Sequence, residues 1–504
     1  MFKNPLLLTA LVLTALVALW GVLDTAGLAA FAQQEVAQQF ESRAWFIMLV
    51  ASLIVVLVLW LALSPFGNVR LGADDDRPEF STVSWLTMLF AAGMGVGLLF
   101  YGAAEPLTHY QLIQEQLGAA GPAAGYAMVV TNFNWALHAW CIYAVTALVI
   151  AYYAYRKGQP GIIGTPIRYS FRRGGWVRPV AWIADLLAIY AIAIGLAGSL
   201  AIGVFQVQGG ITNLFGLSGG DDALKLAVFA VLCIAFLVPL SMDLSRGMAV
   251  LSNIAMGIAF VLMIFILLVG PTHALMDGIV DSIGGYLSSL VRQSFATFPF
   301  FGEAFEEWFH AWTLNYMVWW IAWAPFVGVF VARISRGRTI REFVLGVVFV
   351  PSLFSLFWFG VFGGLGFYAA QNTDLPVVDV ALSQPENTTF FVLNALPLGS
   401  LTGALTVAAA FLFLVTSVVS AAFVLSMFST GGNEDPPVRI KLIWGVILAA
   451  LGLAMMLTGD TGVVRSIIAL GAIPFVFILP LLAVAFLKTL QREERAAMRG
   501  QARP

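Results

Sequence analysis

Twelve apolar runs, each of 18 residues or more, constrain this chain more than any other feature of its sequence. Each run is long enough to cross a hydrocarbon core of roughly 30 Å as a helix, whereas barrel strands alternate over about ten residues. Hydrophobic residues make up 60% of the 504 and charged residues only 10%. The sequence therefore predicts an all-α polytopic membrane protein with 12 transmembrane helices. The runs lie near 5–24, 46–64, 83–103, 124–154, 180–207, 223–241, 247–270, 312–332, 343–368, 400–428, 440–458 and 463–488.

The distribution of basic residues predicts the orientation. With a cytoplasmic N-terminus, 21 of the 25 Lys and Arg residues fall in segments on the cytoplasmic side, as the positive-inside rule requires. We expect a multi-pass protein of the cell inner membrane with both termini cytoplasmic. The net charge of −2 gives no reason to expect a nucleic-acid partner. Cys141 and Cys233 lie inside predicted spans, which argues against a disulfide framework.

Two of the spans contain residues that disfavour an ordinary helix. The third span has three alternating glycines between 93 and 97, and the eighth contains Pro325. Glycine weakens a helix and proline removes a backbone donor. Interrupted helices at corresponding positions of two inverted halves point to a transporter's midplane site. Close helix packing through small residues is the alternative.

Because these two spans are five apart, each would open a half of five helices. The predicted organisation is two N-terminal extra helices in 1–78, a first inverted repeat of helices 3–7 in 79–275, an external (periplasmic) interfacial helix in 276–311, a second inverted repeat of helices 8–12 in 312–490 and a short cytoplasmic tail in 491–504.

Two long motifs identify a family resemblance. The first runs Ala-Ala-Gly-Met-Gly-Val-Gly-Leu-Leu-Phe-Tyr-Gly over 91–102 and is followed by Glu105-Pro106. The second runs Trp-Trp-Ile-Ala-Trp-Ala-Pro-Phe-Val-Gly over 319–328 and continues into the basic segment 332–342. Both resemble the betaine/carnitine/choline transporter family. The resemblance implies a LeuT-type fold of two inverted five-helix repeats, a homotrimer in the lipid bilayer, and small zwitterionic or cationic substrates.

Aromatic residues on the fourth and eighth spans predict a substrate site. Trp140 and Tyr143 are three apart and share a helix face, and Trp135 and Trp320 could complete a box of rings. A quaternary ammonium group cannot donate a hydrogen bond but is attracted by aromatic faces, by about 0.5–2 kcal/mol each. An interfacial aromatic belt is the alternative. The resemblance implies these substrate-binding residues: Trp135, Trp140, Tyr143 and Trp320, with Trp319, Trp323 and Met94 beside them.

Hydroxyl groups on the tenth span suggest a cation site. Thr416 and Ser417 could supply hard oxygen ligands together with backbone carbonyls freed near the glycine motif. A Thr/Ser pair bonding back to its own helix is the alternative. By resemblance the sodium ligands are Ala91, Met94, Phe413, Thr416 and Ser417. We expect no other metal and no cofactor besides the coupling ion.

The sequence also departs from the family pattern. Asn134 stands where histidine is common, and Met317 and Ala322 replace tryptophan and serine. A second sodium site of some members would need threonines where this chain has Ile192 and Leu196. The glycine motif carries no aspartate, unlike in proton-driven members, and Val418-Val419 replaces a common acidic residue.

The predicted function is import of betaine-like quaternary ammonium osmolytes by sodium symport and alternating access. The alternatives are a sodium-independent exchanger of choline or carnitine, a dimethylsulfoniopropionate importer, a passive channel and a membrane sensor. The sequence contains neither a Walker-type loop nor a metal-spaced His/Cys cluster. We therefore expect neither ATP-driven transport nor an enzyme.

Overall fold

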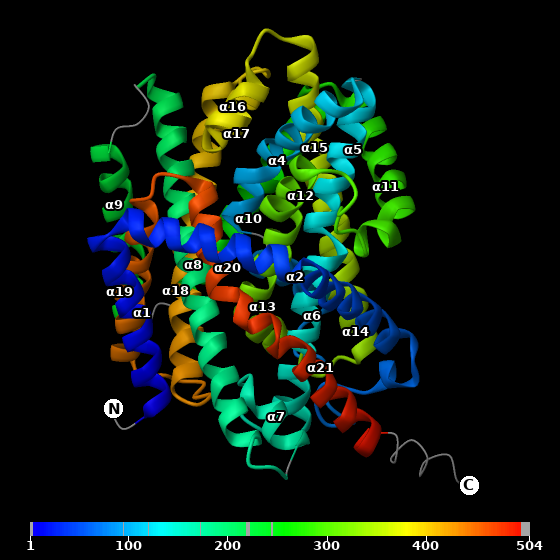
Figure 1. The fold of residues 1–504 in the computed structure, drawn as a ribbon, viewed down its shortest axis with the longest axis vertical. Helices are drawn as coiled ribbons and strands as arrows, with labels where there is room; N and C mark the ends of the chain where they lie inside the picture. Colours follow the sequence, from blue (N-terminus) through cyan, green and yellow to red (C-terminus); the bar gives the residue numbers. More distant parts are fainter. Residues whose placement is uncertain are drawn as a thin grey trace.

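The apolar runs form the helices of a membrane-spanning bundle (Figure 1). The computed structural model describes residues 4–93, 95–118, 120–171, 173–217, 222–242 and 245–494. Within these ranges, 11 helices are long and apolar enough to cross a membrane. The remaining predicted span, near 83–103, corresponds to two shorter helices, α3 and α4. Helices dominate because a lipid-exposed backbone must satisfy its own hydrogen bonds. The predicted class, an all-α polytopic membrane protein, is confirmed.

The first part of the chain contributes ten helices. They are α1 (Pro5–Leu23), α2 (Thr25–Leu63), α3 (Thr82–Gly93), α4 (Val96–Leu117), α5 (Ala120–Trp135), α6 (Leu137–Ala151), α7 (Gly164–Ser170), α8 (Val177–Phe215), α9 (Asp222–Met242) and α10 (Ser245–Val269).

The second part contributes eleven more. They are α11 (Thr272–Ser294), α12 (Glu303–Phe309), α13 (Asn315–Ile334), α14 (Ile340–Val344), α15 (Val350–Asn372), α16 (Val377–Ser383), α17 (Pro385–Leu393), α18 (Gly399–Ser429), α19 (Val438–Met456), α20 (Thr461–Val476) and α21 (Ile478–Thr489). Short helical turns of other pitch lie between or after them, at Pro65–Asn68, Tyr152–Arg156, His310–Leu314, Leu345–Phe349 and Leu490–Glu494.

Different helices lie at the two ends of the bundle. In Figure 1, α16 and α17 cap the upper end, whereas α7 lies at the lower end. The start of α1 and the end of α21 also lie toward the lower end, and α2 runs obliquely across the bundle. The helices α16 and α17 therefore lie at the end of the bundle opposite α7 and the two termini of the described helices.

The helix boundaries differ from the sequence prediction in three places. The eighth span is not interrupted, because α13 runs continuously through Pro325. The second span starts earlier than expected, since α2 is a single helix of 39 residues. The helix predicted within 276–311 begins and ends earlier than expected, as α11, while its interfacial position stays a prediction, and α12 leads directly into the turn before α13.

Two breaks in helices determine the position of the site. Gly95, just before α4, has an extended backbone, with φ −111° and ψ −158°. Ala136 separates α5 from α6 with φ −102° and ψ −120°. A residue outside the helical region interrupts the ladder of backbone hydrogen bonds and leaves carbonyl groups for other donors. The first break was expected from the glycines; the second carries neither glycine nor proline.

Candidate functional site

A small buried cavity lies where the two broken helices meet α8 and α13. Its volume is about 40 Å³, and its walls are mainly aromatic. The lining residues are Gly95, Val96, Gly97, Trp135, Tyr143, Ser199, Ile202, Tyr316, Trp319, Trp320 and Trp323.

The rings of the cavity wall pack against one another across three helices. Trp320 lies edge-on to Trp135 and to Tyr143, with ring centroids 5.0 and 6.0 Å apart. Tyr316 stacks on Trp320 at 5.6 Å and on Trp319 at 5.9 Å. Edge-to-face and offset contacts of this kind are the favoured geometries of aromatic pairs. Five of the rings, three of them from α13, are thus connected by ring contacts, and Trp323 of α13 also lines the cavity.

The structure brings together five of the seven residues predicted at the substrate site. Trp135, Tyr143, Trp319, Trp320 and Trp323 all line the cavity. The other two are placed differently. Trp140 is buried on α6 outside this lining, with its ring 5.6 Å from that of Tyr143, and Met94 lies outside the described residues.

Two buried polar atoms of the wall have no hydrogen-bond partner within the described part of the chain. They are the hydroxyl oxygen of Tyr143 and the indole nitrogen of Trp323. Buried polar groups are nearly always hydrogen-bonded. These two groups are therefore candidate donors for a polar ligand.

Gly97 allows the ring of Trp135 to approach the broken helix. A Cβ atom at this position would lie 3.2 Å from Cη2 of Trp135, which is tighter than ordinary van der Waals contact. The glycine motif thus has a packing role at the cavity in addition to weakening the helix.

Glu105 lies behind the aromatic wall and is fully buried. Its Oε2 accepts hydrogen bonds from the Trp135 indole nitrogen at 2.7 Å and the Tyr316 hydroxyl at 2.6 Å. Its Oε1 accepts from Nδ2 of Asn134 at 2.9 Å and lies 3.2 Å from Nε2 of His109. The carboxyl group therefore connects α4, α5 and α13.

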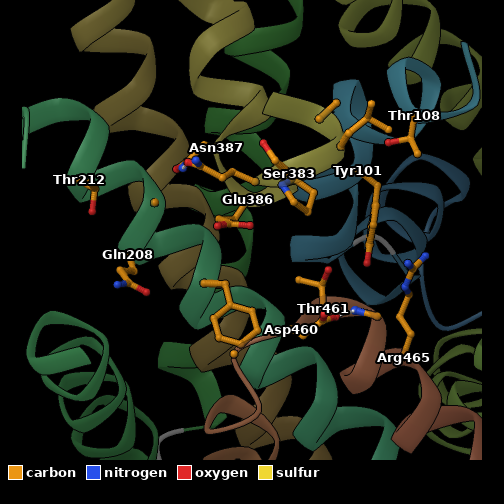
Figure 2. Close-up of a pocket in the computed structure, with 18 of the residues that line it drawn as sticks. Tyr101, Thr108, Gln208, Thr212, Ser383, Glu386, Asn387, Asp460, Thr461 and Arg465 are labelled. Atoms are coloured by element: carbon orange, nitrogen blue, oxygen red, sulfur yellow. Dashed lines mark hydrogen bonds between the residues drawn. The ribbon is translucent and has the colours of Figure 1, made fainter. Parts of the chain in front are cut away.

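A wider cavity of about 850 Å³ lies toward the end of the bundle capped by α16 and α17 (Figure 2). Its lining is polar and carries both signs of charge, with Lys225, Glu386, Asp460 and Arg465 contributed by different elements. The guanidinium of Arg465 lies over the ring of Trp312, 4.3 Å from its centroid.

Glu386 is the perturbed acid of this wider cavity. Burial raises the pKa of its carboxyl above the ordinary 4.5, the negative charge of Asp460 adds to this rise, and its own backbone N–H and Lys225 oppose it. The carboxyl therefore takes up a proton at a higher pH than an exposed glutamate does.

Tyr101 separates the two cavities. It lines the wider one, and its ring lies 6.1 Å from Trp135, 6.0 Å from Tyr316 and 6.2 Å from Trp319, all of which line the smaller one.

Four of the five predicted sodium ligands lie within the described residues. Thr416 is buried, and its hydroxyl donates to the carbonyls of Leu412 and Phe413 on its own helix at 3.0 and 3.1 Å. Ser417 is half-buried on the same helix. Ala91 belongs to α3, and Met94 lies outside the described residues. The ion site stays a prediction.

Sequence reasoning missed two residues of this region. Tyr316 precedes Trp319 and Trp320 by three and four positions, a spacing that places it on the same helix face. Glu105 was noted only as part of a motif, because it lies two residues beyond the predicted third span, where an acidic residue is not unusual.

A bundle of membrane-spanning helices that encloses an aromatic cavity beneath a wider polar one has the construction of a small-molecule transporter. The family model described as "BCCT, betaine/carnitine/choline family transporter" matches residues 5–495. The chain belongs to this family. The family and the relatives that the chain matches are transporters rather than enzymes, and the LeuT-type arrangement of two inverted repeats stays a prediction.

Three relatives illustrate the similarity. The glycine betaine transporter OpuD of Bacillus subtilis is 38% identical over 97% of this chain and 94% of its own length. The ectoine/hydroxyectoine transporter of Virgibacillus pantothenticus is 33% identical, covering 90% of this chain and 89% of its own. The high-affinity choline transport protein of Escherichia coli is 34% identical, covering 89% and 66%.

One solved structure aligns with most of this chain. A Na⁺-coupled sialic acid symporter in a substrate-bound, outward-open state aligns with 87% of this chain and 86% of its own at 15% identity, with a TM-score of 0.45.

Proposed function

We propose that this protein imports betaine-like quaternary ammonium osmolytes across the cell inner membrane by sodium symport. The observation that carries the proposal is the buried cavity, which is walled by six aromatic side chains. Aromatic faces attract a cation that cannot form hydrogen bonds, and more strongly so when water is excluded. The unpaired donors of Tyr143 and Trp323 suit the carboxylate at the other end of a zwitterion.

The two cavities suit alternating access. The wider cavity gives a route of entry from one end of the bundle, and the ring of Tyr101 stands between it and the aromatic cavity. Substrate and ion binding would favour closure, and the two predicted repeats would then rock about the site. A passive channel would instead need a continuous polar lining.

Sodium coupling is supported by the hydroxyl groups of α18. Thr416 donates its proton to its own helix, as the alternative to a sodium site also expects, so the support for sodium is the resemblance of these residues to the family's ligands together with the lone pairs that the hydroxyl oxygen keeps. The proposed ligands remain Ala91, Met94, Phe413, Thr416 and Ser417. The inward direction, cytoplasmic termini and trimeric assembly belong to the same proposal.

Uptake into proteoliposomes tests this function. Labelled betaine, choline, carnitine and dimethylsulfoniopropionate would each be offered with and without an inward sodium gradient. Sodium-dependent accumulation of betaine supports the proposal. Uptake that ignores sodium but needs a substrate inside the vesicles would support the exchanger, and uptake of dimethylsulfoniopropionate alone would change the substrate.

A further inference from the structure

The hydrogen bonds around Glu105 bear on how the cavity distinguishes a charged head group from a neutral one of the same shape. This question rests on the proposed function. A single oxygen of Glu105, Oε2, accepts hydrogen bonds from both Trp135 and Tyr316. Both rings line the cavity. One buried carboxyl group is therefore directly connected to two of the aromatic faces that would meet the substrate.

The groups around Glu105 donate hydrogen bonds to its two oxygens, as they would to a carboxylate. Trp308 donates its indole N–H to Nδ1 of His109 at 3.0 Å, and an indole can only donate. In neutral His109 the proton must then be on Nε2, which points at Oε1 of Glu105. With Asn134, each carboxyl oxygen accepts two hydrogen bonds, so a proton on either oxygen would displace a donor.

A carboxylate that accepts from an aromatic N–H or O–H increases the negative charge of the ring. Hydrogen bonds to an ionised acceptor are shorter and stronger than neutral ones, and a low local dielectric strengthens them further. The attraction of a cation to a ring depends on the negative charge of the ring face. The 2.7 and 2.6 Å bonds to Glu105 would therefore make Trp135 and Tyr316 better partners for a cation.

We propose that Glu105 is a positioning residue that sets the preference of the cavity for a positively charged head group, acting through its hydrogen bonds to Trp135 and Tyr316. A purely structural role, in which the carboxylate only orients the rings, makes a different prediction. Loss of Glu105 would then weaken charged and neutral ligands equally.

The test uses betaine and tert-butylacetate (3,3-dimethylbutanoate). Both carry a carboxylate, and they differ in having a nitrogen or a carbon atom at the centre of the trimethyl group. Binding of both is measured on the purified full-length protein. The wild type should prefer betaine by about tenfold or more. In Glu105→Gln this preference should fall by about fivefold, with tert-butylacetate binding as well as before or better. Glu115→Gln, an exposed glutamate on the same helix, should leave the preference unchanged.

In Glu105→Gln the amide oxygen can keep the donors Trp135 and Tyr316, while the amide nitrogen takes the place of Oε1, so that the Nε2–H of His109 loses its acceptor and only the contact with Asn134 can be restored. The Oδ1 atom of Asn134 is buried without a partner in the described part of the chain, so a flipped Asn134 amide could accept from the side-chain nitrogen that this substitution introduces. Ultraviolet resonance Raman spectra should show a weaker indole N–H hydrogen bond in Glu105→Gln, independently of any ligand.

If Glu105→Gln does not fold, a second variant tests whether Glu105 sets the preference for a charged head group. Tyr316→Phe keeps the ring but removes its hydrogen bond to Glu105, and it should lower the betaine preference by about twofold. A preference unchanged in the variants that fold, or betaine and tert-butylacetate weakened in parallel, would overturn the inference while the proposed function stands. A wild type that binds neither betaine nor choline would overturn both.

Discussion

The indole nitrogen of Trp320 donates a 2.7 Å hydrogen bond to the backbone carbonyl of Asn134. In an unbroken helix this carbonyl would bond to the amide four residues further on, but the break at Ala136 releases it. Helix α13 is thereby attached to the broken fourth span at the aromatic cavity. The ring of Trp320 is held in place by backbone, so changes at this residue separate the effect of its ring from that of its hydrogen bond.

Substitution of Trp320 should distinguish these two effects. Trp320→Leu removes both the ring and the N–H group, and betaine affinity should fall by about tenfold or more, or about 1.4 kcal/mol. Trp320→Phe keeps one aromatic ring but loses the hydrogen bond and the five-membered ring of the indole, so its loss should be smaller than that of Trp320→Leu. Isothermal titration of the purified variants measures both. An affinity unchanged in a folded Trp320→Leu variant would remove the aromatic cavity as the substrate site.

Gly97→Ala should weaken substrate binding through Trp135. The new methyl group would lie 3.2 Å from the ring, and overpacking costs about 1–3 kcal/mol, or about fivefold or more in affinity. Gly121→Ala on α5 is the matched control, because nothing lies within 4 Å of its Cβ position. Equal betaine dissociation constants for the two variants would contradict the packing role.

Sodium activation of betaine uptake should be nearly hyperbolic. Only one set of oxygen-bearing residues is expected, because Ile192 and Leu196 offer no side-chain oxygen, and one site gives a Hill coefficient of about 1. The double variant Thr416→Ala/Ser417→Ala should abolish or strongly weaken the sodium dependence. Initial uptake rates against sodium concentration provide the measurement. Clear cooperativity would show a second site that the sequence does not reveal.

The raised pKa of Glu386 gives a pH-dependent stability. Folded Glu386 holds its proton more tightly than the unfolded chain does, so its contribution to stability falls as pH rises through its folded pKa. Glu386→Gln, which cannot ionise, should therefore raise the melting temperature by about 1–3 °C at about pH 8. This gain should shrink toward about pH 4. The exposed Glu115→Gln is the control, and a gain that is constant with pH would contradict the assignment.

The apolar side of α11 should take part in assembly. Val280, Leu287 and Val291 are exposed on one face of this amphipathic helix. We expect a trimer by light scattering of detergent-purified protein, and Val291→Asp should shift it toward smaller species. A wild type that is monomeric at micromolar concentration would count against the trimer.

The number and placement of the membrane spans could be predicted because hydrophobic length and basic residues act locally along the chain. Most aromatic residues of the cavity could also be named, because the motif of the eighth span resembles that of a known family and thereby pointed to Trp319, Trp320 and Trp323. Trp140 was included because it shares a helix face with Tyr143, but neighbours on one helix need not border the same space.

The remaining features depend on contacts between segments far apart in the chain. The break at Ala136 has no local cause, and it is accompanied by hydrogen bonds from other helices, such as that of Trp320 to Asn134. Pro325 does not interrupt α13, because neighbouring packing can override an unfavourable residue within a membrane helix. The partners of Glu105 come from three helices, which no sequence pattern joins.

The small volume of the aromatic cavity has a kinetic consequence. A space of about 40 Å³ holds only two or three water molecules, and a nitrogen carrying three methyl groups is much bulkier. The rings of Tyr143, Trp320 and their neighbours must separate before a substrate can enter. Association that waits for such a rearrangement is slower than diffusional encounter. The protein would then select its substrates partly by how quickly they are admitted, so that two compounds of equal affinity can differ in their rates of uptake.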